Sequence, residues 1–332
     1  MIAYQELEPG QAPASCRADQ GIGPLSDTDR AVHAPDRHIV AVEGDSLVGR
    51  CSCWWTEAPR RVDARIGVIG HYAAASHAAG TGLLARACRM LAAAGCSMAV
   101  GPMDGNTWRR YRFITERGEA PPFFLEPDNP DEWVSHWTSA AFTPLATYWS
   151  AVNDDLSVED ARTDAAKDAL RAAGITIRRF DAVQPEAELR RIYDLSLRAF
   201  SGNFLYTPIP EREFMAGNRA LLAHVRPELI LMAERGTDLV GFMFAIPDLL
   251  QARRGESIDT LVLKTMAVDE ACRGLGLGGV LMDDVQREAR ALGFRRAIHA
   301  LMHEQNRSRT LSDRYAHTIR RYTLFSQPLG GS

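Results

Sequence analysis

The sequence predicts a mixed α/β protein built from layers of strands and helices. The chain has 332 residues, 46% hydrophobic and 24% charged, which is typical of globular proteins and enough for about two domains. The second half alternates apolar strands with amphipathic helices in the order β-α-α-β-β-β-α-β-α-β. The first half is mainly strands, with one long helix between two of them. Such orders pack as helices against a central sheet.

In the first half, strands are predicted where apolar residues alternate or cluster between turn signals. These segments are 38–42, 47–55, 63–74, 97–101 and 142–152. Helices are predicted at 83–94, which is rich in Ala and Leu and stops at Gly95, and at 133–141. Residues 1–36 are polar and irregular, and no element is predicted there.

In the second half, apolar residues at helical spacing predict a helix over 186–200, followed by a second helix over 209–225. A long helix at 278–292 ends before Gly293, and 308–315 is a short helix. The predicted strands are 175–180, 229–233, 239–246, 260–268, 295–303 and 320–325.

Charge and composition exclude several classes of function. The net charge is −4, and the first 150 residues carry 13 basic and 17 acidic side chains, so neither half is a basic nucleic-acid-binding domain. The N-terminus has no apolar signal-peptide core, no membrane span is predicted, and a cytoplasmic location is expected. The six cysteines lack metal-binding spacing, so they are interpreted as small buried hydrophobes, and no metal is expected.

One local motif indicates chemistry. Arg273-Gly274-Leu275-Gly276-Leu277-Gly278 follows a predicted strand and opens a predicted helix. Glycines let backbone N–H groups approach one point without obstruction by a Cβ. The first turn of a helix adds unpaired N–H groups and a positive dipole potential, so the segment is suited to bind a diphosphate. Arg273 would add a fixed positive charge at the edge of this loop.

These residues resemble the GNAT superfamily of N-acetyltransferases, whose signature Q/R-x-x-G-x-G/A joins a strand to a helix. Arg273, Gly276 and Gly278 match every fixed position, and the order of elements across 173–332 is similar to that fold. The alternative is a Rossmann unit, which needs an acidic residue about 20 positions after the glycines. Glu304 is 26 residues beyond Gly278, and antiparallel hairpins precede the loop, so the GNAT resemblance is favoured.

The first half repeats this layout more faintly. His77-Ala-Ala-Gly80-Thr-Gly82 also lies between a strand and a helix, 196 residues before the Arg273 motif. We therefore expect two tandem GNAT-like domains, each with a mixed, mostly antiparallel sheet flanked by helices. The expected boundaries are 1–152 for the first domain, 153–172 for a linker with an exposed helix, and 173–332 for the second domain. Because His77 replaces Gln or Arg, the first domain is expected to be degenerate.

The resemblance implies acetyl-CoA as co-substrate, with its pyrophosphate on the glycine loop. Backbone groups of Met266, Ala267 and Val268 would pair with pantetheine, and Asn306 would contact the coenzyme. Tyr315 would protonate the leaving thiolate, although it follows Asn306 by nine residues where about seven is usual. Family members often carry a carboxylate base on the first central strand, but Val262 and Lys264 occupy those positions here.

Proton transfer therefore needs another group. His299 and His303 are four apart on an alternating strand, and Glu304 follows at its end. His303 and Glu304 are the candidate bases, whereas His299 is interpreted as a core or wall residue. Lys264 is a further candidate if burial neutralises it, with pairing or an anionic substrate as its other interpretations.

The predicted function is transfer of acetyl from acetyl-CoA to a primary amine of a small molecule, by direct attack in a ternary complex. Two alternatives remain open: an acyl-CoA-binding sensor without turnover, and an aminoacyl-tRNA-dependent transferase of the same tandem fold. The near-neutral charge argues against the second alternative. The sequence does not identify the acceptor or the oligomeric state.

Overall fold

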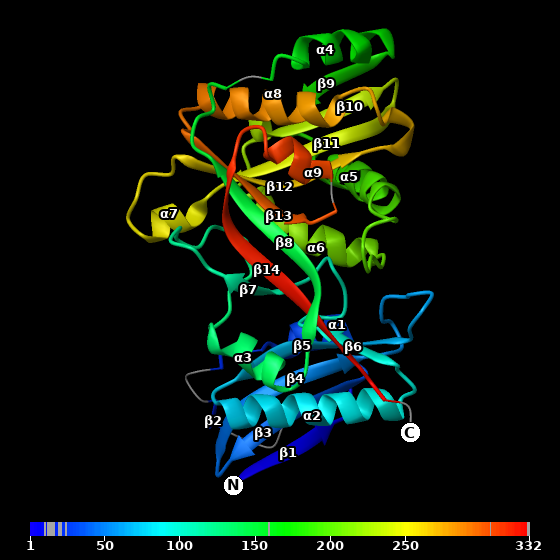
Figure 1. Cartoon of the computed structure of the whole chain (residues 1–332). Helices are drawn as coiled ribbons and strands as arrows, with labels where there is room; N and C mark the ends of the chain where they lie inside the picture. Colours follow the sequence, from blue (N-terminus) through cyan, green and yellow to red (C-terminus); the bar gives the residue numbers. More distant parts are fainter. Residues whose placement is uncertain are drawn as a thin grey trace.

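The computed structural model describes residues 1–9, 11, 17–18, 22–23, 25–158, 160–305 and 307–330. The chain forms two lobes joined by two long strands that cross between them (Figure 1). The strands form one continuous sheet in the order β1-β3-β4-β5-β6-β14-β8-β13-β12-β11-β10-β9, with β2 paired to β4 and β7 paired to β14. Most pairs are antiparallel, whereas β2–β4, β5–β6 and β12–β13 are parallel, so the predicted mixed sheet is confirmed.

The first lobe is a sheet covered mainly by one long helix. Its elements are β1 (Ile2–Leu7), β2 (Arg17–Ala18), α1 (Asp27–His33), β3 (Arg37–Glu43), β4 (Ser46–Trp54), β5 (Ile66–Ala74), α2 (His77–Ala93), β6 (Met98–Gly101), β7 (Phe113–Glu116) and α3 (Glu132–Ser139). The inner face of α2 is buried through alanines and leucines against β3, β4 and β5. Trp133 and Trp137 of α3 complete this core.

Two predictions for this lobe were wrong. Residues 1–36 contain β1, β2 and α1, none of which was predicted. β1 is a sheet edge on which only Leu7 is buried, so its sequence lacks an apolar run. Helix α2 begins at His77, six residues before the predicted start, because Ser76 caps it through Oγ and the amide of Ala79. Gly80 and Gly82 therefore lie inside the helix.

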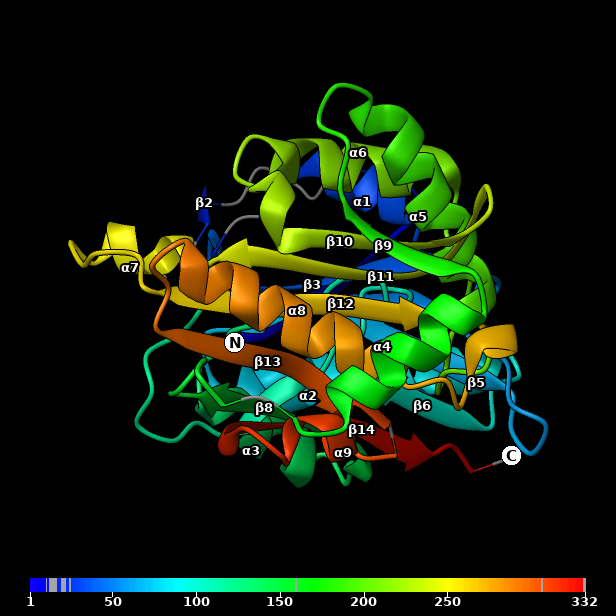
Figure 2. The same ribbon diagram turned by 90° about the horizontal axis from the view of Figure 1, so that it is seen from above.

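The second lobe is a three-layer arrangement. Helices α4 (Thr163–Ala172) and α8 (Leu277–Ala291) lie on one face of the sheet, and α5 (Pro185–Ala199) and α6 (Glu211–Leu222) lie on the other (Figure 2). The remaining elements are β9 (Ile175–Arg179), β10 (Ile230–Arg235), β11 (Asp238–Pro247), α7 (Leu249–Arg253), β12 (Thr260–Val268), β13 (Arg296–His303), α9 (Arg307–Ser312) and the 3-10 turns η1 (Pro227–Leu229) and η2 (Glu270–Cys272). Separate apolar clusters fill the two sides of this sheet.

Two strands belong to both lobes. β8 (Thr143–Asn153) pairs with β13, and β14 (His317–Pro328) pairs with β6 and β7, while β8 and β14 pair with each other. The last strand of each lobe therefore pairs with a strand of the other lobe. Helix α4, expected in an exposed linker, contacts α8 and β9 and buries Leu170. Within the described ranges, no helix is long and apolar enough to cross a bilayer.

Candidate functional site

The glycine loop of the second lobe has the conformation that its sequence predicts. Gly274 and Gly276 have φ values of +87° and +79°, which favour glycine, and α8 starts at Leu277 directly after them. A Cβ at Gly276 would lie 2.7 Å from the Cβ of Ala166 on α4. A Cβ at Gly278 would meet Leu311 and Met266 at 3.4 and 3.5 Å, which is ordinary contact.

The loop presents free backbone donors. Val280 is the first α8 residue whose amide bonds back into the loop, to the carbonyl of Gly276. Among the described residues, the amides of Gly276, Leu277, Gly278 and Gly279 have no hydrogen-bond acceptor. Four consecutive free N–H groups at the positive end of a 15-residue helix form an anion-binding cradle. Arg273 is exposed and pairs with Glu270 at 2.7 Å, at the surface beside this cradle.

Next to the loop, two central strands separate. The parallel pairing of β12 with β13 ends at Leu263 and His299, and beyond it β13 pairs only with β8. Lys264 occupies a β-bulge relative to β11 at this point, and residues 264–266 are half-buried rather than fully buried. One edge of β12 from Lys264 to Val268 therefore faces a gap in the sheet. Met266 borders both the gap and Gly278, and the Ala267 side chain is buried on the opposite face.

His303 is the last residue of β13, the strand that borders the other side of the gap, and Glu304 follows it. The His303 ring contacts Tyr148 and Phe204, and its Nδ1 accepts the amide proton of Gln305 at 3.1 Å. This bond assigns the proton of the neutral ring to Nε2, which is buried and has no partner among the described residues. Burial lowers the pKa of His303, opposed by Glu304. Glu304 is exposed, and its amide donates to the carbonyl of Thr147.

The remaining predicted residues have different surroundings. The Tyr315 hydroxyl donates to Oδ1 of Asp283 on α8 at 2.5 Å, so its proton is engaged there, and burial followed by Asp283 raises its pKa. Asn306 lies outside the described residues. His299 is buried with Nδ1 2.8 Å from Ser312 Oγ, which agrees with its interpretation as a core residue. Burial lowers the pKa of His299 to about 4.

The corresponding region of the first lobe is closed. Because α2 starts at His77, its first turn occupies the place where the second lobe has its glycine loop. A Cβ at Gly80 would lie 2.4 Å from both His136 Nδ1 and the Tyr72 hydroxyl, so α3 covers this helix end. The gap between β5 and β6 is bridged by Met103, whose amide donates to the carbonyl of Ile69. In its described residues, this lobe keeps the fold without an open cradle or gap.

Arg112 is a site residue that sequence reasoning missed. It precedes β7 in the first lobe, yet its charge acts on both Lys264 and His303 of the second lobe. Its guanidinium lies 4.0 Å from the ring centre of Tyr111 and 4.1 Å from that of Tyr148. The chain contains 38 basic residues, and only two are lysines, so no local signal distinguishes this arginine.

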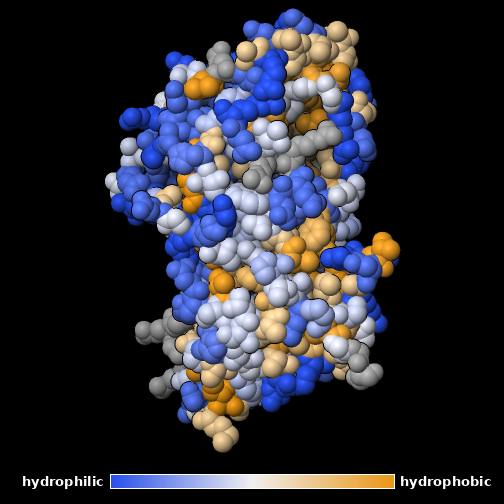
Figure 3. All heavy atoms as spheres, in the orientation of Figure 1, coloured by the Kyte–Doolittle hydropathy of each residue, from blue (hydrophilic) through white to orange (hydrophobic). Residues whose placement is uncertain are grey.

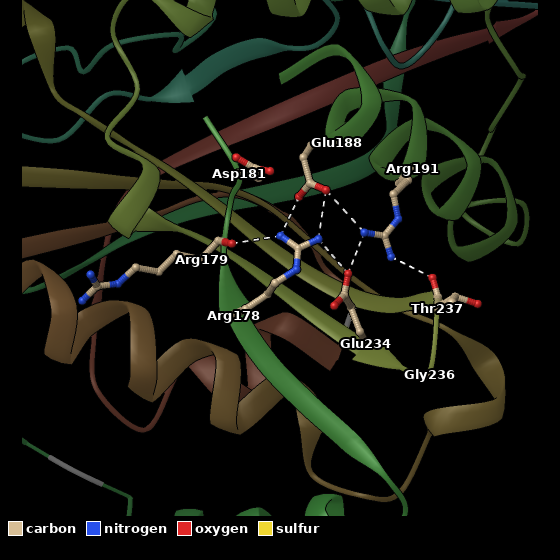
Figure 4. Close-up of a pocket in the computed structure, with 8 residues that line it drawn as sticks. All are labelled: Arg178, Arg179, Asp181, Glu188, Arg191, Glu234, Gly236 and Thr237. Carbon is tan, nitrogen blue, oxygen red and sulfur yellow. Dashed lines mark hydrogen bonds and ion pairs between the residues drawn. The ribbon is translucent and has the colours of Figure 1, made fainter. Parts of the chain in front are cut away.

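A surface hollow beside β9 and β10 is filled by ion pairs. Arg178 binds Glu188 and Glu234, and Arg191 binds Glu234 and the carbonyl of Thr237 (Figure 4). Because these charged side chains pair with one another, the ion pairs stabilise the contact between β9 and α5. The hollow is distinct from the glycine loop. The space-filling view shows hydrophilic side chains spread over both lobes (Figure 3).

Comparisons with known proteins agree with this geometry. The family model described as Acetyltransferase (GNAT) family matches residues 189–312, so the second lobe contains a GNAT domain. A tandem GNAT protein from the clavulanic acid biosynthesis pathway is 12% identical, with a TM-score of 0.50 and complete coverage of both chains. The second lobe thus carries a GNAT domain, and the fold of the chain as a whole is that of two tandem GNAT-like domains.

Two further solved structures share the fold. A GCN5-related N-acetyltransferase from Sphaerobacter thermophilus is 13% identical, with a TM-score of 0.51, covering 88% of this chain and 80% of that chain. A glucosamine N-acetyltransferase region of a fungal multi-domain GH3 β-N-acetylglucosaminidase is 12% identical, with a TM-score of 0.53, covering 92% of this chain and 35% of that one. At these identities the likeness extends to the fold alone. No curated protein matches the sequence significantly.

Proposed function

We propose that this protein is an acyl-CoA-dependent N-acyltransferase whose second lobe transfers acetyl from acetyl-CoA to the primary amine of a small molecule. The observation that carries the proposal is the row of free amides at Gly276–Gly279 beside the gap between β12 and β13. A diphosphate fits the amides, and an extended amide-bearing arm fits the unpaired edge of β12. The first lobe lacks both features and is assigned no donor site.

The chain's own residues position the reaction. The α8 amides hold the donor's phosphates, and the edge of β12 from Lys264 to Val268 offers backbone groups to the donor's arm and a candidate N–H for the thioester oxygen. The phenyl rings of Phe204 and Tyr148 border His303 at the inner end of the gap and limit access of water. Such positioning supplies a large part of the rate in a direct transfer between two bound substrates.

Proton transfer is assigned from the geometry at the end of β13. The amine must lose a proton when it attacks. With Nδ1 of His303 occupied by the Gln305 amide, the neutral ring offers a donor at Nε2 instead of a free lone pair. The exposed carboxylate of Glu304 is therefore the preferred proton acceptor, through water. The engaged hydroxyl of Tyr315 gives no support to its role as the acid for the thiolate.

Gly278 offers a direct test of the donor site. A Gly276→Asp change would clash with Ala166, whereas a side chain at Gly278 fits and occupies the second position of α8. An aspartate there is favourable for a helix N-terminus but places a carboxylate where phosphate must bind. We expect Gly278→Asp to weaken acetyl-CoA binding by more than about tenfold, on the order of 1.4 kcal/mol or more, measured by titration calorimetry.

Two control variants separate charge from size. Gly278→Ala adds only the Cβ, and Gly278→Asn adds nearly the volume of aspartate without its charge. The affinity for acetyl-CoA should decrease in the order wild type, Gly278→Ala, Gly278→Asn, Gly278→Asp. Each chain should bind one molecule of acetyl-CoA. If the folded Asp variant binds acetyl-CoA as tightly as the Ala variant, the loop is not the phosphate site and the proposal is wrong. Acetyl-CoA binding without release of CoA toward any amine would instead favour the sensor.

A further inference from the structure

We propose that the acceptor amine carries an anionic group, a carboxylate or a phosphate, and that Arg112 of the first lobe binds it together with Lys264 of the second lobe. This inference rests on the proposed acyl transfer at the gap between β12 and β13. It assigns to the degenerate first lobe a direct part in choosing the substrate.

Aromatic rings lie over the Arg112 guanidinium, but N–H groups at its edges have no hydrogen-bond acceptor among the described residues. The side chain is 6% exposed, and the rings of Tyr111 and Tyr148 lie close to it, at 4.0 and 4.1 Å from its central carbon. Rings at this distance satisfy part of the charge through cation–π contacts but accept none of the in-plane N–H donors. Nε and Nη1 are buried and have no hydrogen-bond acceptor in the described parts of the chain.

A second buried arginine shows how unusual this arrangement is. Arg320 is 1% exposed, and its guanidinium is saturated by Glu126 and by the carbonyls of Arg117, Ala120 and Pro121. Burying a cation without such partners is costly. A bound anion would therefore supply the partner that the free edge of Arg112 lacks. A carboxylate or phosphate matches a guanidinium edge with two parallel hydrogen bonds.

The groups around Arg112 add positive potential. Lys264 lies within its electrostatic reach at the bulge where the gap opens, and no ion pair or hydrogen bond is found for its ammonium among the described residues. His303 is also within reach, with a free donor at Nε2. The acidic group acting on His303 is Glu304, which is exposed at the strand end. The donor's phosphates are expected at the α8 amides and leave these cations unpaired.

The test compares acceptors in matched pairs. One pair is an α-amino acid and its carboxamide, and the other is phosphoethanolamine and ethanolamine. The rate of CoA release gives kcat/KM for each amine with wild type, Arg112→Gln, Arg112→Lys and the control Arg110→Gln, which changes an exposed neighbour. Lys264→Met serves as a second variant if Arg112→Gln fails to fold. Acetyl-CoA affinity is measured separately by calorimetry.

We expect wild type to prefer the anionic member of at least one pair. Arg112→Gln should reduce that preference by about 10- to 100-fold, as expected for a charge-assisted bidentate contact. Arg112→Lys should restore only part of it because an ammonium lacks the planar fork. Arg110→Gln should keep the preference. Which pair shows the preference then identifies the anionic group as carboxylate or phosphate.

Several results would overturn the inference. Equal use of both members of each pair by wild type excludes an anion site for the acceptor. An equal loss of kcat/KM for charged and neutral amines in Arg112→Gln would show that Arg112 stabilises the leaving thiolate or the fold instead. If wild type does not bind acetyl-CoA, the proposed function fails by itself. The anion site is then judged by whether inorganic phosphate raises the melting temperature of wild type by more than that of Arg112→Gln, and equal shifts in both would contradict it.

Discussion

Lys264 is a residue whose surroundings oppose its charge. It is half-buried at the bulge of β12, close to the guanidinium of Arg112. Burial, and then the charge of Arg112, lower the pKa of Lys264 from 10.5 to about 8. The ammonium is still mostly protonated at pH 7, so the folded protein holds two neighbouring cations there. An anion bound between them would reverse this unfavourable interaction.

Replacing Lys264 by methionine should therefore stabilise the ligand-free protein. Below pH 8 the lysine is protonated in both the folded and the unfolded chain, so the variant has its full gain in free energy of unfolding over wild type. This gain is at most about 3 kcal/mol, because solvent around the half-buried side chain reduces it. Between pH 8 and 10.5 only the unfolded chain keeps the proton, so wild type becomes more stable with rising pH and the difference disappears. Urea unfolding from pH 7 to 10.5 measures this.

The other lysine provides the control. Lys167 pairs with Asp284 at 2.9 Å, so Lys167→Met should not stabilise the protein at any pH. A Lys264→Met variant that is less stable than wild type at pH 7 would show that the ammonium has a stabilising partner.

At the residue scale, the sequence predicts what is local. Gly274, Gly276 and the start of α8 follow from conformational preferences within six residues, and the structure has them as expected. Arg112 depends on Tyr148, which lies 36 positions later on another strand. No spacing rule connects these two residues, so Arg112, unlike Lys264, was not predictable from the sequence as part of the site.

At the scale of elements, β14 depends on a buried ion pair. Arg320 on this strand and Glu126 in the preceding Pro-rich segment are joined at 2.8 Å with almost no exposure of either side chain. Tyr322 also donates to Glu126. Burial raises the pKa of Glu126, while Tyr322 and Arg320 oppose the shift. The pair fixes the segment around Phe123, whose ring lies in the core of the second lobe.

Removing one partner of this pair should be far more harmful than removing both. Glu126→Gln leaves the Arg320 charge buried without its counter-charge, and we expect a loss of about 3–5 kcal/mol in the free energy of unfolding. Adding Arg320→Met to that variant should recover part of the loss, because the buried charge is removed while the carbonyls of Arg117, Ala120 and Pro121 lose their donor. A double variant as unstable as the single variant would show that shape, and not charge, dominates here.

A neighbouring surface pair on the same strand is the matched control. Arg321 and Glu116 are 3.2 Å apart and largely exposed, so Glu116→Gln should cost less than about 1 kcal/mol. Chemical unfolding of all variants under one condition makes the comparison.

Helices and strands were predicted correctly where one buried face makes apolar residues recur at the spacing of a helix or a strand. Apart from α7 (Leu249–Arg253), which was not predicted, the helices and long strands of the second lobe were predicted within a few residues because their inner faces are continuously apolar. β14 is longer than predicted, His317–Pro328 instead of 320–325, because polar residues at its ends pair with strands of both lobes. The start of α2 was missed because Ser76 provides a cap that outweighs the two glycines in its first turns.

At the scale of the whole molecule, strand exchange joins the lobes into one unit. β8 and β14 pair along most of their length and each also pairs with a strand of the other lobe. Trp108 of the first lobe contacts Phe200 and Phe214 of the second, and Arg109 binds Glu213 there at 2.6 Å. The tandem repeat was visible in the sequence, but the exchange was not, since it depends on pairing between strands about 170 residues apart.

The exchange predicts that both lobes unfold together. All six tryptophans lie within the first 150 residues: Trp54, Trp55, Trp108, Trp133, Trp137 and Trp149. Tryptophan fluorescence therefore reports the first lobe and its interface, whereas far-UV circular dichroism also reports the helices α5, α6 and α8 of the second lobe. In urea the two signals should give one midpoint and one slope, as expected for a two-state transition.

Acetyl-CoA makes this test specific to coupling, because the donor site is proposed only in the second lobe. At a concentration 100 times its Kd, a ligand of the folded state adds about 2.7 kcal/mol to the free energy of unfolding. If the lobes are coupled, both the fluorescence and the circular dichroism midpoints should rise by the same amount, although the tryptophans lie outside the binding lobe. The Gly278→Asp variant should show neither shift. Separate midpoints, or a shift confined to the dichroism signal, would mean that the lobes unfold independently despite their shared strands.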